Sequence, residues 1–538
     1  MDSLVSDDND NIIRTQPLEY EPNGGLGYEF FRAMKFYKSN VSQYIVETGE
    51  KDTFRELLKR CIRTALNMKL EGLTENDLVC LCSYNQKDIC TPFIASMFLG
   101  LKVTSLDPSL SLADTAYLLK QVKPTIIFVV PEALDLIENS IEQAEITCKI
   151  VVFGPSDTHQ QFEEFLIPNS EEHDFRPVIV PPEETAVIFF SSGTTGLPKG
   201  ICQSHYALLA QAVNVINYGA VTSVSLYYSS LYWISAVLFL TATILSGTAR
   251  VICKSFDPTQ IWKILDKYKV SFAFLAPSQA SEMLKVGRPD NVDTSSLLCV
   301  LTGGGVFSEK QLLALRDLLP GTYISQGYGQ TEVAGVLTCF NMNDVKDTLR
   351  LHYKPSSCGR PIHGIWYKIV DVETEQNLGP NEQGELRVKT KYAMNGYYNL
   401  DSSESFDTDG WLKTGDIVYY DEDHCFYVVD RIKEMLKYKS WHIAPAMLED
   451  ILNNHPAIKR SVVIGIPDEE DGDHPMAVVI LNPGSEITSE EIEAYVAERV
   501  QDRQKLRAGV KFVTSFPITP SGKIKRREIK QMVLTGQI

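Results

Sequence analysis

The residues with the clearest capacity for chemistry form a short loop of small and hydroxylated side chains. An apolar strand pattern, AVIFF at residues 186–190, runs into SSGTTGLPKG at residues 191–200. Glycines permit positive φ and close backbone approach, and successive N–H groups in such a loop form an anion-binding nest. The expected phosphate-binding residues are Ser191, Ser192, Gly193, Thr194, Thr195, Gly196 and Lys199. No Gly-Lys-Ser/Thr follows, so the loop is not a Walker A loop, and a helix is predicted from about Ser204.

This loop resembles the signature loop of the AMP-forming adenylating enzymes: acyl- and aryl-CoA synthetases, firefly-type luciferases and peptide-synthetase adenylation domains. The resemblance extends from about residue 30 to about residue 530, with further motifs in the family's order. It implies ATP, Mg²⁺ and coenzyme A as cofactors, and a small-molecule carboxylic acid as the remaining partner.

The segment SQGYGQTE at residues 325–332 resembles the second core motif of this family. Its glycines let a flat adenine ring lie against the backbone, with Tyr328 available to stack on it. By the resemblance, Thr331 hydrogen-bonds the α-phosphate or the acyl carbonyl, and Glu332 is the Mg²⁺ ligand, since hard oxygen donors suit this ion. The expected nucleotide contacts in this segment are Gln326, Gly327, Tyr328 and Thr331.

Two further segments resemble family motifs around the nucleotide. LTGGGV at residues 301–306 reads as a strand followed by glycines, and WLKTGD at residues 411–416 resembles the ribose motif. The carboxylate of Asp416 would accept hydrogen bonds from both ribose hydroxyls, each contributing roughly 1.5–3 kcal/mol. The residues expected to border the acyl group are Trp233, Gly303, Gly304, Gly305 and Gly329.

The last two motifs lie near the end of the chain. DRIKEMLKYKSWH at residues 430–442 resembles the family's hinge, with Asp430 as the pivot. The remaining hinge predictions are Arg431 as a ribose contact, Lys433 and Lys437 near the nucleotide, and Lys439 and Ser440 on the face that meets coenzyme A. FPITPSGK at residues 516–523 resembles the terminal catalytic motif, so that Lys523 joins Thr331 and Glu332 as a catalytic residue. Removing one preorganised donor of this kind typically costs roughly 2.7–4 kcal/mol.

Three positions depart from the family pattern. Where many relatives carry Pro-x-x-His beside the acyl pocket, alignment on Gly247 places Ser230 and Trp233, so imidazole chemistry is lost. Ser440 stands where most relatives have glycine and could narrow the access of coenzyme A. Ser325 stands where beetle luciferases carry arginine, which argues against light emission.

The surrounding sequence indicates the elements that must position these residues. The first half alternates helical patterns, such as residues 54–70 and 92–101, with apolar strand patterns, such as residues 77–83 and 125–130. Buried apolar strands separated by helices are typical of parallel sheets covered on both faces. From Gly364 short strands and turns indicate an antiparallel or barrel-like unit, and an α+β pattern follows after about Pro445.

Composition and charge limit the classes of function. The 538 residues are 44% hydrophobic and carry a net charge of −18, which argues against a nucleic-acid partner. The acidic excess precedes residue 431, since the rest of the chain has 16 Lys and Arg against 15 Asp and Glu. Residues 206–249 lack charge, but polar interruptions favour a buried helix–strand–helix over a transmembrane segment. Eleven cysteines without a CxxC pair indicate reduced thiols.

We therefore predict an α/β fold with a large N-terminal domain of helix-covered β-sheets and a small β-barrel, followed by a small mobile α+β C-terminal domain. The expected division is residues 1–429, binding AMP and the acyl group, and residues 430–538, the catalytic domain that turns about Asp430.

The expected function is an acid–CoA ligase acting on a medium- or long-chain fatty acid or an aryl acid. The alternatives are an adenylation-only enzyme that loads another acceptor and a non-catalytic, luciferase-like adenylate or acyl-binding protein. We expect a cytoplasmic location, with the peroxisome as the alternative, although the final residues TGQI are not a Ser-Lys-Leu signal. The sequence does not predict the oligomeric state.

Overall fold

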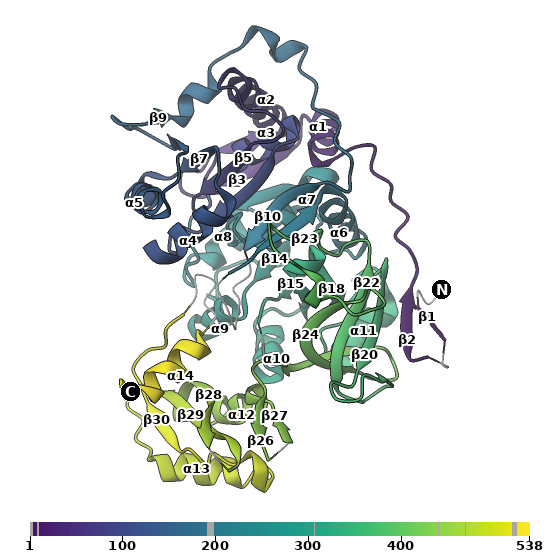
Figure 1. The fold of residues 1–538 in the computed structure, drawn as a ribbon. Helices are drawn as coiled ribbons and strands as arrows, with labels where there is room; N and C mark the ends of the chain where they lie inside the picture. Colours follow the sequence, from purple (N-terminus) through teal and green to yellow (C-terminus); the bar gives the residue numbers. More distant parts are fainter. Residues whose placement is uncertain are drawn as a thin grey trace.

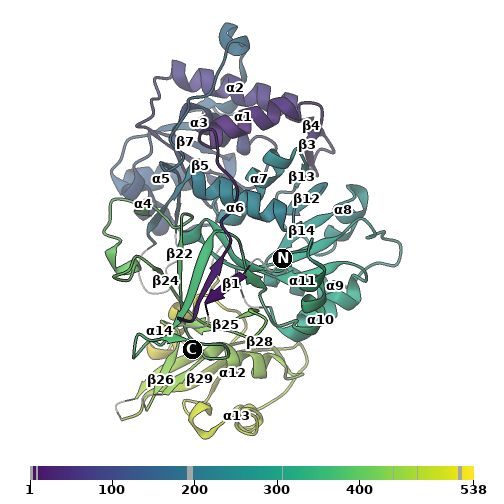
Figure 2. The same cartoon turned by 90° about the vertical axis from the view of Figure 1, so that its right-hand side faces the viewer.

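The computed structural model describes residues 4–7, 10–190, 198–305, 307–439, 441–468, 470–518 and 524–538. A large part built of sheets and helices lies above a smaller part formed by the end of the chain (Figure 1). A view turned by 90° shows the same arrangement (Figure 2). The helices of the large part are α1 (Leu26–Phe36), α2 (Phe54–Leu70), α3 (Cys90–Leu99), α4 (Leu112–Val122), α5 (Leu134–Ala144), α6 (His205–Asn217), α7 (Ile234–Ser246), α8 (Ile261–Lys267), α9 (Pro277–Val286), α10 (Glu309–Leu318) and α11 (Val345–Tyr353).

The first sheet of the large part has eight strands and carries the predicted phosphate loop. Its strands run in the order β23 (Gly396–Tyr397), β11 (Gly200–Ser204), β10 (Thr185–Phe190), β6 (Lys102–Leu106), β5 (Leu78–Cys82), β7 (Ile126–Val129), β8 (Lys149–Val152) and β9 (Gln160–Gln161). The strands from β10 to β9 pair in parallel, and the apolar runs of β5, β7 and β10 suit strands that are buried on both faces.

One strand of this sheet was not predicted from the sequence. Residues 200–204 form strand β11, which pairs antiparallel with β10, and α6 begins only after it. The glycine-rich loop therefore connects two antiparallel strands, and the helix predicted from about Ser204 begins at His205. The segment ICQS has two apolar residues followed by two polar ones, so it lacks the alternation that would indicate a strand.

The second sheet of the large part positions the glycine-rich motifs. Its order is β16 (Tyr323–Gln326), β15 (Cys299–Thr302), β14 (Phe272–Leu275), β12 (Val224–Tyr227), β13 (Ala249–Ile252), β3 (Val41–Ile45) and β4 (Lys51–Thr53). Every pair is parallel except β3 with β4. The glycines at 303–305 and the segment from Gly327 thus leave the carboxyl ends of the neighbouring strands β15 and β16, where ligands of parallel sheets commonly bind.

Two antiparallel sheets complete the large part. The first runs β1 (Leu4–Asp7), β2 (Ile12–Thr15), β20 (Ile365–Val370), β22 (Gly384–Thr390), β24 (Leu412–Tyr420) and β25 (Phe426–Arg431), with β21 (Asn377–Leu378) beside β20. The second contains β17 (Tyr328–Gln330), β18 (Gly335–Cys339) and β19 (Arg360–Pro361). The predicted barrel is an open sheet in the described residues, because its pairing order ends at β1 and β25 without joining them.

The small part has one mixed sheet with helices packed on it. Its strands run in the order β27 (Trp441–Ile443), β26 (Leu436–Tyr438), β29 (Gly472–Leu481) and β28 (Ile458–Asp468), and β30 (Val510–Phe512) pairs with β29. The helices are α12 (Pro445–Asn453), α13 (Ser489–Ala497) and α14 (Arg526–Leu534). In both views α14 lies on the side facing the large part, and α13 lies on the far side.

The predicted helices form for identifiable reasons. Thr53 caps α2 through a reciprocal pair of hydrogen bonds with Glu56, and Gly72 follows the helix with a φ of +86°. The charge-free segment forms α6, β12 and α7, and α7 is buried along most of its length. Among the described helices none combines the length and the apolar character that a membrane crossing requires.

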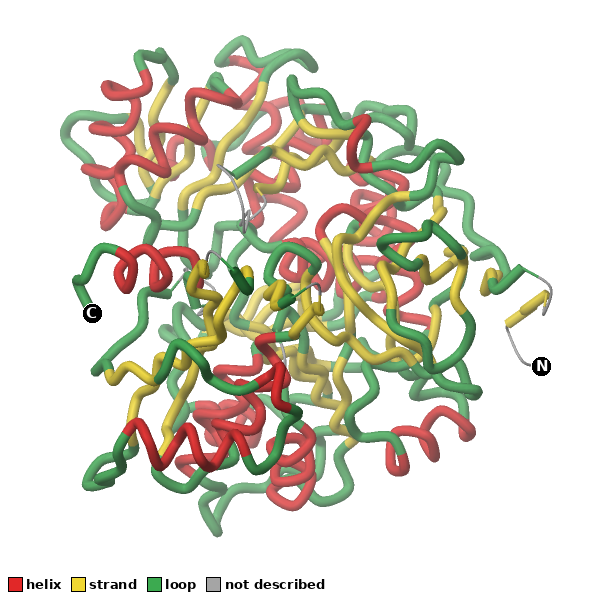
Figure 3. Tube along the Cα trace, turned by 60° about the horizontal axis from the view of Figure 1, so that its bottom comes forward, coloured by secondary structure: helices red, strands yellow, loops and turns green. Residues whose placement is uncertain are grey.

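The interior of the molecule is built from the sheets and the helices that cover them. Figure 3 shows strands running through the middle of the chain trace with helices around them. The largest apolar cluster joins α1, α2, α3, α6 and α7 to the strands of both parallel sheets. All eleven cysteines, each of which is described, are free of disulfide bonds, and burial is the largest cause that raises the pKa of each thiol.

Candidate active site

A buried carboxylate organises the nucleotide end of the site. Asp416, on β24, is 3% exposed, and its Oδ2 accepts hydrogen bonds from the Tyr328 hydroxyl and from Nε2 of Gln330, both at 2.6 Å. Arg431 reaches Oδ1 with its Nε at 3.2 Å. A carboxylate offers about four lone-pair positions, so one position on Oδ1 is left for a further donor such as a ribose hydroxyl. Three predicted motifs therefore meet at Asp416, because Tyr328 and Gln330 come from the second core motif, Asp416 from the ribose motif and Arg431 from the hinge motif.

The electrostatics of this cluster follow from its burial. Burial, together with the negative charge of Asp416, raises the pKa of Tyr328 well above its ordinary value, so its hydroxyl remains a donor. Burial alone would lower the pKa of Arg431. The carboxylates of Asp416, Glu434 and Glu332 outweigh it and raise that pKa instead, which keeps the guanidinium charged. An aromatic ring, a fixed cation and a carboxylate therefore lie together.

The predicted catalytic pair lies on a short turn next to this cluster. Thr331 and Glu332 belong to a single 3₁₀ turn, Thr331–Val333, between β17 and β18. Ala334 ends the turn with a φ of +58°. The negative charge of Glu332 raises the pKa of Arg431 and of Tyr397, so the Glu332 carboxylate lies near both side chains.

The glycines of the site have different structural reasons, and close backbone approach requires glycine at Gly329. A Cβ on Gly329 would lie 2.0 Å from the carbonyl oxygen of Gly335, so the pairing of β17 with β18 requires glycine there. Gly304 has a φ of +83° and open space around it, and Gly327 donates its N–H to Thr302 O at 2.9 Å. The Oε1 of Gln326 accepts from the N–H of Phe307 at 3.3 Å. Gly303 and Gly305 have only Cβ contacts of 3.3 Å or longer.

The structure describes only the end of the predicted phosphate loop. Residues 191–197, which include Ser191, Ser192, Gly193, Thr194, Thr195 and Gly196, lie outside the described residues. Lys199 is exposed, and its Nζ lies 4.6 Å from the centroid of the Tyr397 ring. Gly200 then begins β11. The described end of this segment thus carries one cation, the Lys199 ammonium, which lies over an aromatic face.

The position of the missing histidine is occupied by an aromatic at the start of α7. Trp233 is the N-cap residue of α7, and its ring meets that of Tyr232 edge to face, with centroids 4.9 Å apart. Ser230 donates its hydroxyl to Asp107 at 3.3 Å and its carbonyl accepts the Trp233 N–H at 2.9 Å. Trp233 packs against the apolar cluster beneath the first sheet, and no imidazole is present at its position.

The predicted hinge lies directly after the nucleotide cluster. Asp430 is 9% exposed, and its carboxylate accepts the N–H groups of Arg431 at 2.7 Å and Ala446 at 3.1 Å. Burial raises the pKa of Asp430 to about 6, against the lowering effect of these two donors and of Arg526. Arg526 also contacts Glu449 and Glu434, so the start of α14 is tied to the hinge segment and to α12.

The structure describes three further basic residues of the hinge motif, and all three are exposed. Lys433 and Lys437 are exposed, and the backbone N–H of Lys437 donates to Asp473 at 3.2 Å. Lys439 is 58% exposed and its Nζ pairs with Asp471 of the same domain at 3.1 Å. Ser440 and Lys523 lie outside the described residues. Lys439 directly follows β26, the strand that pairs with β27 and β29.

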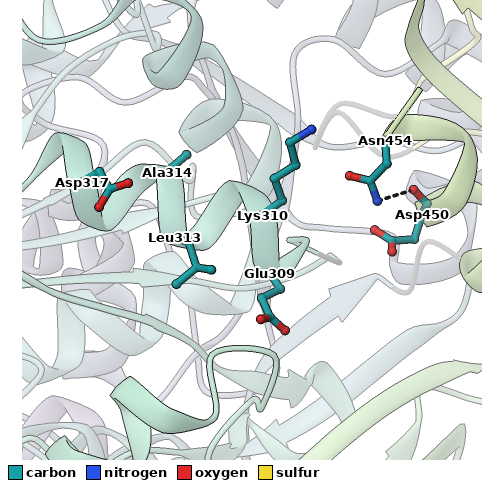
Figure 4. A pocket seen from close by; sticks show the side chains of 7 residues that line it. All are labelled: Glu309, Lys310, Leu313, Ala314, Asp317, Asp450 and Asn454. Atoms are coloured by element: carbon teal, nitrogen blue, oxygen red, sulfur yellow. Dashed lines mark hydrogen bonds between the residues drawn. The ribbon is translucent and has the colours of Figure 1, made fainter. Parts of the chain in front are cut away.

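A cavity of about 510 Å³ separates the two parts of the molecule. Figure 4 shows that side chains of α10 face Asp450 and Asn454 at the end of α12. Its lining residues are Glu309, Lys310, Leu313, Ala314, Asp317, Asp450 and Asn454. Burial, with a further contribution from the charge of Glu309, raises the pKa of Asp450. The cavity is open, and five of its seven lining residues are polar or charged.

Three functional residues of the site were missed by the sequence prediction. Gln330 donates to Asp416 and, at 2.9 Å, to the carbonyl of Thr414. Gln203 and Gln211, both 0% exposed, donate to backbone carbonyls of the turn that carries Thr331 and Glu332. Gln330 lies inside the SQGYGQTE motif. Gln203 and Gln211 are polar residues within largely apolar segments, and this interruption is the sequence signal that could have identified them.

The fold, with its glycine-rich motifs at the strand ends of the large part, is that of an adenylating enzyme. The chain belongs to the AMP-binding enzyme family: this family matches residues 32–398, and the AMP-binding enzyme C-terminal domain matches residues 447–523. The predicted resemblance to the adenylating superfamily, and to its luciferase-like branch, is confirmed.

The most similar sequences include both luciferases and CoA ligases. Luciferin 4-monooxygenase of Photinus pyralis is 31% identical over 98% of both chains. Peroxisomal OPC-8:0-CoA ligase 1 of Arabidopsis thaliana is 30% identical over 95% of this chain and 94% of its own length. Membership of the family implies the use of ATP, and the relatives differ in the reaction that follows.

Solved structures share the fold. The luciferase-like enzyme from the nonluminescent mealworm Zophobas morio is 40% identical, with a TM-score of 0.75, and covers 78% of this chain and 99% of its own. ATP-bound MatB from Rhodopseudomonas palustris has a TM-score of 0.83 at 19% identity, covering 94% of this chain and 98% of its own. The α/β fold with a large N-terminal part and a small C-terminal part is confirmed.

Proposed function

We propose that this chain is an ATP-dependent acid–CoA ligase that forms an acyl-AMP and then an acyl-CoA thioester. The observation that carries the proposal is the Asp416 cluster, in which Tyr328, Gln330 and Arg431 converge on one carboxylate beside the Thr331–Glu332 turn. This arrangement supports a nucleoside at Asp416 with its phosphates directed toward the turn. CoA-ligase relatives such as the Arabidopsis thaliana protein support the second step.

The proposed reaction has two displacements. A carboxylate oxygen of the acid attacks the α-phosphorus of ATP, and the bond to pyrophosphate breaks. The thiolate of coenzyme A then attacks the acyl carbonyl, the bond to AMP breaks, and the thiol proton goes to solvent. Dividing one difficult acylation into two easier steps is the logic of covalent activation. Arg431 and Thr331 are the described donors that would stabilise charge on the nucleotide.

The residues near the turn suit a magnesium ion bound together with the triphosphate. The Glu332 carboxylate is a hard oxygen donor, and Mg²⁺ usually takes one or two carboxylates with substrate phosphates and water as its other ligands. We propose Glu332 as the protein ligand. The bound ion would neutralise charge on the phosphates. Glu332 lies on a turn whose backbone carbonyls accept hydrogen bonds from residues distant in sequence.

We propose that residues 430–538 move as the catalytic domain, with Asp430 as the pivot. Rotation would bring Lys523 to the reacting phosphate in the first step and the face of Lys439 and Ser440 to coenzyme A in the second. The exposed position of Lys439 and its pairing with Asp471 of the same domain suit a face that waits outside the site during the first step.

The proposed acid is larger than acetate, namely a medium- or long-chain fatty acid or an aryl acid. The support is the wall of apolar residues from α7, whose thirteen residues carry no charge. Gly329 adds little to this argument, since backbone packing alone requires glycine there. Thioester formation with acids from C2 to C18 and with cinnamates tests the size class, and a preference for acetate would contradict it.

The decisive experiment is carboxylate-dependent exchange between ATP and pyrophosphate, with Lys523→Ala as the comparison. We expect exchange with wild-type protein and a loss of roughly 100-fold or more in the variant. Absence of exchange with every acid would support the non-catalytic binding protein instead, for which the loss of the usual histidine at Trp233 is the favouring observation. Exchange without thioester formation would instead support an adenylation-only enzyme that loads another acceptor. Ser440→Gly would then test whether the serine blocks the access of coenzyme A.

A further inference from the structure

Two buried glutamines lie beneath the turn that carries Thr331 and Glu332. Gln203, on β11, donates from its Nε2 to the carbonyl of Thr331. Gln211, on α6, donates from its Nε2 to the carbonyls of Val333 at 2.9 Å and Val336 at 2.8 Å. Both side chains belong to residues that are 0% exposed. A strand and a helix of the large domain therefore reach the turn from its buried side.

The turn has little structure of its own, so these external donors define its position. It contains only three residues and ends at Ala334 in the left-handed region, which disfavours an L-residue. The carbonyl of Glu332, between the two glutamine-bound carbonyls, accepts the N–H of Met394 at 2.8 Å. Each carbonyl of the turn thus receives a hydrogen bond from a segment distant in sequence. Such outside bonds fix the direction in which the side chains at 331 and 332 leave the backbone.

The two amides are poor choices for a core that serves stability alone. The Oε1 atoms of Gln203 and Gln211 are buried and have no hydrogen-bond partner among the described residues. A buried acceptor without a partner opposes folding, whereas an apolar side chain of similar volume would not. Local departures of this kind are expected where a site needs them.

We propose that Gln203, supported by Gln211, is a positioning residue that holds Glu332 and Thr331 in the geometry needed for the metal–triphosphate complex. The inference rests on the proposed function and deepens it, since it assigns the placement of the metal ligand to an amide on β11. It separates two functions of the site: Asp416 holds the nucleoside, while Gln203 controls how the turn meets the phosphates and their cation.

The test compares Gln203→Met, which keeps the volume and removes the donor, with Gln203→Glu. A buried carboxyl at 203 remains protonated at low pH and can donate to the Thr331 carbonyl, so Gln203→Glu restores function as the pH falls. Thr64→Val is the matched control, because Thr64 is 0% exposed, its hydroxyl lacks a described partner, and it lies on α2, which is not part of the site.

The readout is the affinity for Mn²⁺, used as a spectroscopic substitute for Mg²⁺ and measured by electron paramagnetic resonance in the presence of ATP, together with AMP affinity without metal. We expect Gln203→Met to weaken Mn²⁺ binding about fivefold or more, with AMP affinity unchanged within about twofold and Thr64→Val unchanged in both. Equal weakening of both affinities, or no change in Mn²⁺ binding, would overturn the proposal.

Two further measurements keep the outcome clear. If Gln203→Met does not fold, Gln211→Met takes its place and is expected to show the same selective loss to a smaller extent. Asp416→Ala should lower the affinity for AMP, and this loss would show that the AMP measurement reports binding at the nucleoside site. Because metal binding needs no turnover, wild-type protein that exchanges no pyrophosphate would contradict the proposed function and leave the positioning test in force.

Discussion

Two buried aspartates on neighbouring strands have opposite surroundings. Asp416 on β24 and Asp430 on β25 lie one register position apart, since Asp416 pairs with Arg431 and Ile417 pairs with Asp430. Asp416 meets a guanidinium, a phenol and an amide, whereas the direct donors to Asp430 are two backbone N–H groups. The pKa of Asp430 is raised to about 6, with burial as the largest cause.

The difference shows how one hairpin can serve two purposes. Around Asp416 the partners are fixed before a ligand arrives, which reduces the reorganisation that binding requires. Around Asp430 the negative charge is only partly compensated, so that the pivot region is destabilised above the pH at which the group ionises. The proposed nucleotide contact, with its partners already in place, thus lies directly beside the less stable proposed pivot.

Removing the organising carboxylate should have the largest effect. Asp416→Ala eliminates the acceptor for the ribose and leaves Arg431 without its direct partner. At roughly 1.5–3 kcal/mol for a charge-assisted hydrogen bond, loss of the one ribose bond that the free position on Oδ1 can accept lowers the affinity for AMP roughly 10- to 150-fold, measured by isothermal titration calorimetry. Asp423→Ala, at the exposed turn of the same hairpin, is the control. A loss below about tenfold would mean that Asp416 does not hold the ribose.

Neutralising the pivot should stabilise the protein in a pH-dependent manner. Between about pH 4 and pH 6 the native Asp430 retains a proton that the unfolded chain has released, so the stability of the wild type falls as the pH rises through this window. Above about pH 6 the full penalty, about 3 kcal/mol, is present. Asp430→Asn removes this slope.

Urea unfolding at pH 4.5, 6 and 7.5 measures the comparison between wild type and Asp430→Asn. The variant should gain stability relative to the wild type as the pH rises, with the smallest difference at pH 4.5. Asp371→Asn, an aspartate in an exposed turn of the antiparallel sheet, should show no such gain. A constant difference at all three pH values would contradict the raised pKa of Asp430.

A single donor to Asp416 should have a smaller effect than the carboxylate itself. Tyr328→Phe keeps the ring that could stack on adenine and removes the hydroxyl that donates to Oδ2 at 2.6 Å. A net loss of about 1 kcal/mol lowers AMP affinity about fivefold. Tyr323→Phe, on the exposed start of β16, serves as the control. A loss as large as that of Asp416→Ala would show that the hydroxyl positions the whole cluster.

The smallest expected effect lies across the cavity between the two parts. Asp450→Asn removes a carboxylate whose pKa is raised by burial and by the charge of Glu309. Relief of this repulsion should increase the free energy of unfolding by about 0.5 kcal/mol at low salt, and less at high salt because ions screen the pair. Thermal denaturation at two salt concentrations measures it. A decrease in stability would indicate that Asp450 has an attractive partner instead.

Much of the fold followed from local patterns in the sequence. Phe54–Leu70 forms a helix with the predicted bounds because its apolar spacing, its Thr53 cap and the following glycine all agree. The helix–strand–helix prediction for the charge-free segment is confirmed by α6, β12 and α7. The strand β11 was missed because its pairing with β10 is a tertiary property, and five residues carry too little periodicity to reveal it.

The site was predictable only where its motifs are compact. Tyr328, Asp416 and Arg431 belong to three separate motifs, and the structure brings them together as the resemblance implies. The amides of Gln203 and Gln330 were not predicted, because a glutamine that binds a distant carbonyl leaves no spacing signal. The roles of Lys523 and of the phosphate-loop residues remain predictions.

The pairing of β24 with β25 continues past the proposed pivot, and this has a kinetic consequence. Arg431 still pairs with Asp416, and the N–H of Ile432 donates to the carbonyl of Gly415 at 2.9 Å. Turning the backbone at Asp430 would first have to open this end of the hairpin, including the ion pair. Each of these bonds is worth about 1 kcal/mol net, so rotation should carry a sizeable activation enthalpy. The thioester-forming step would then slow more steeply on cooling than the formation of the adenylate.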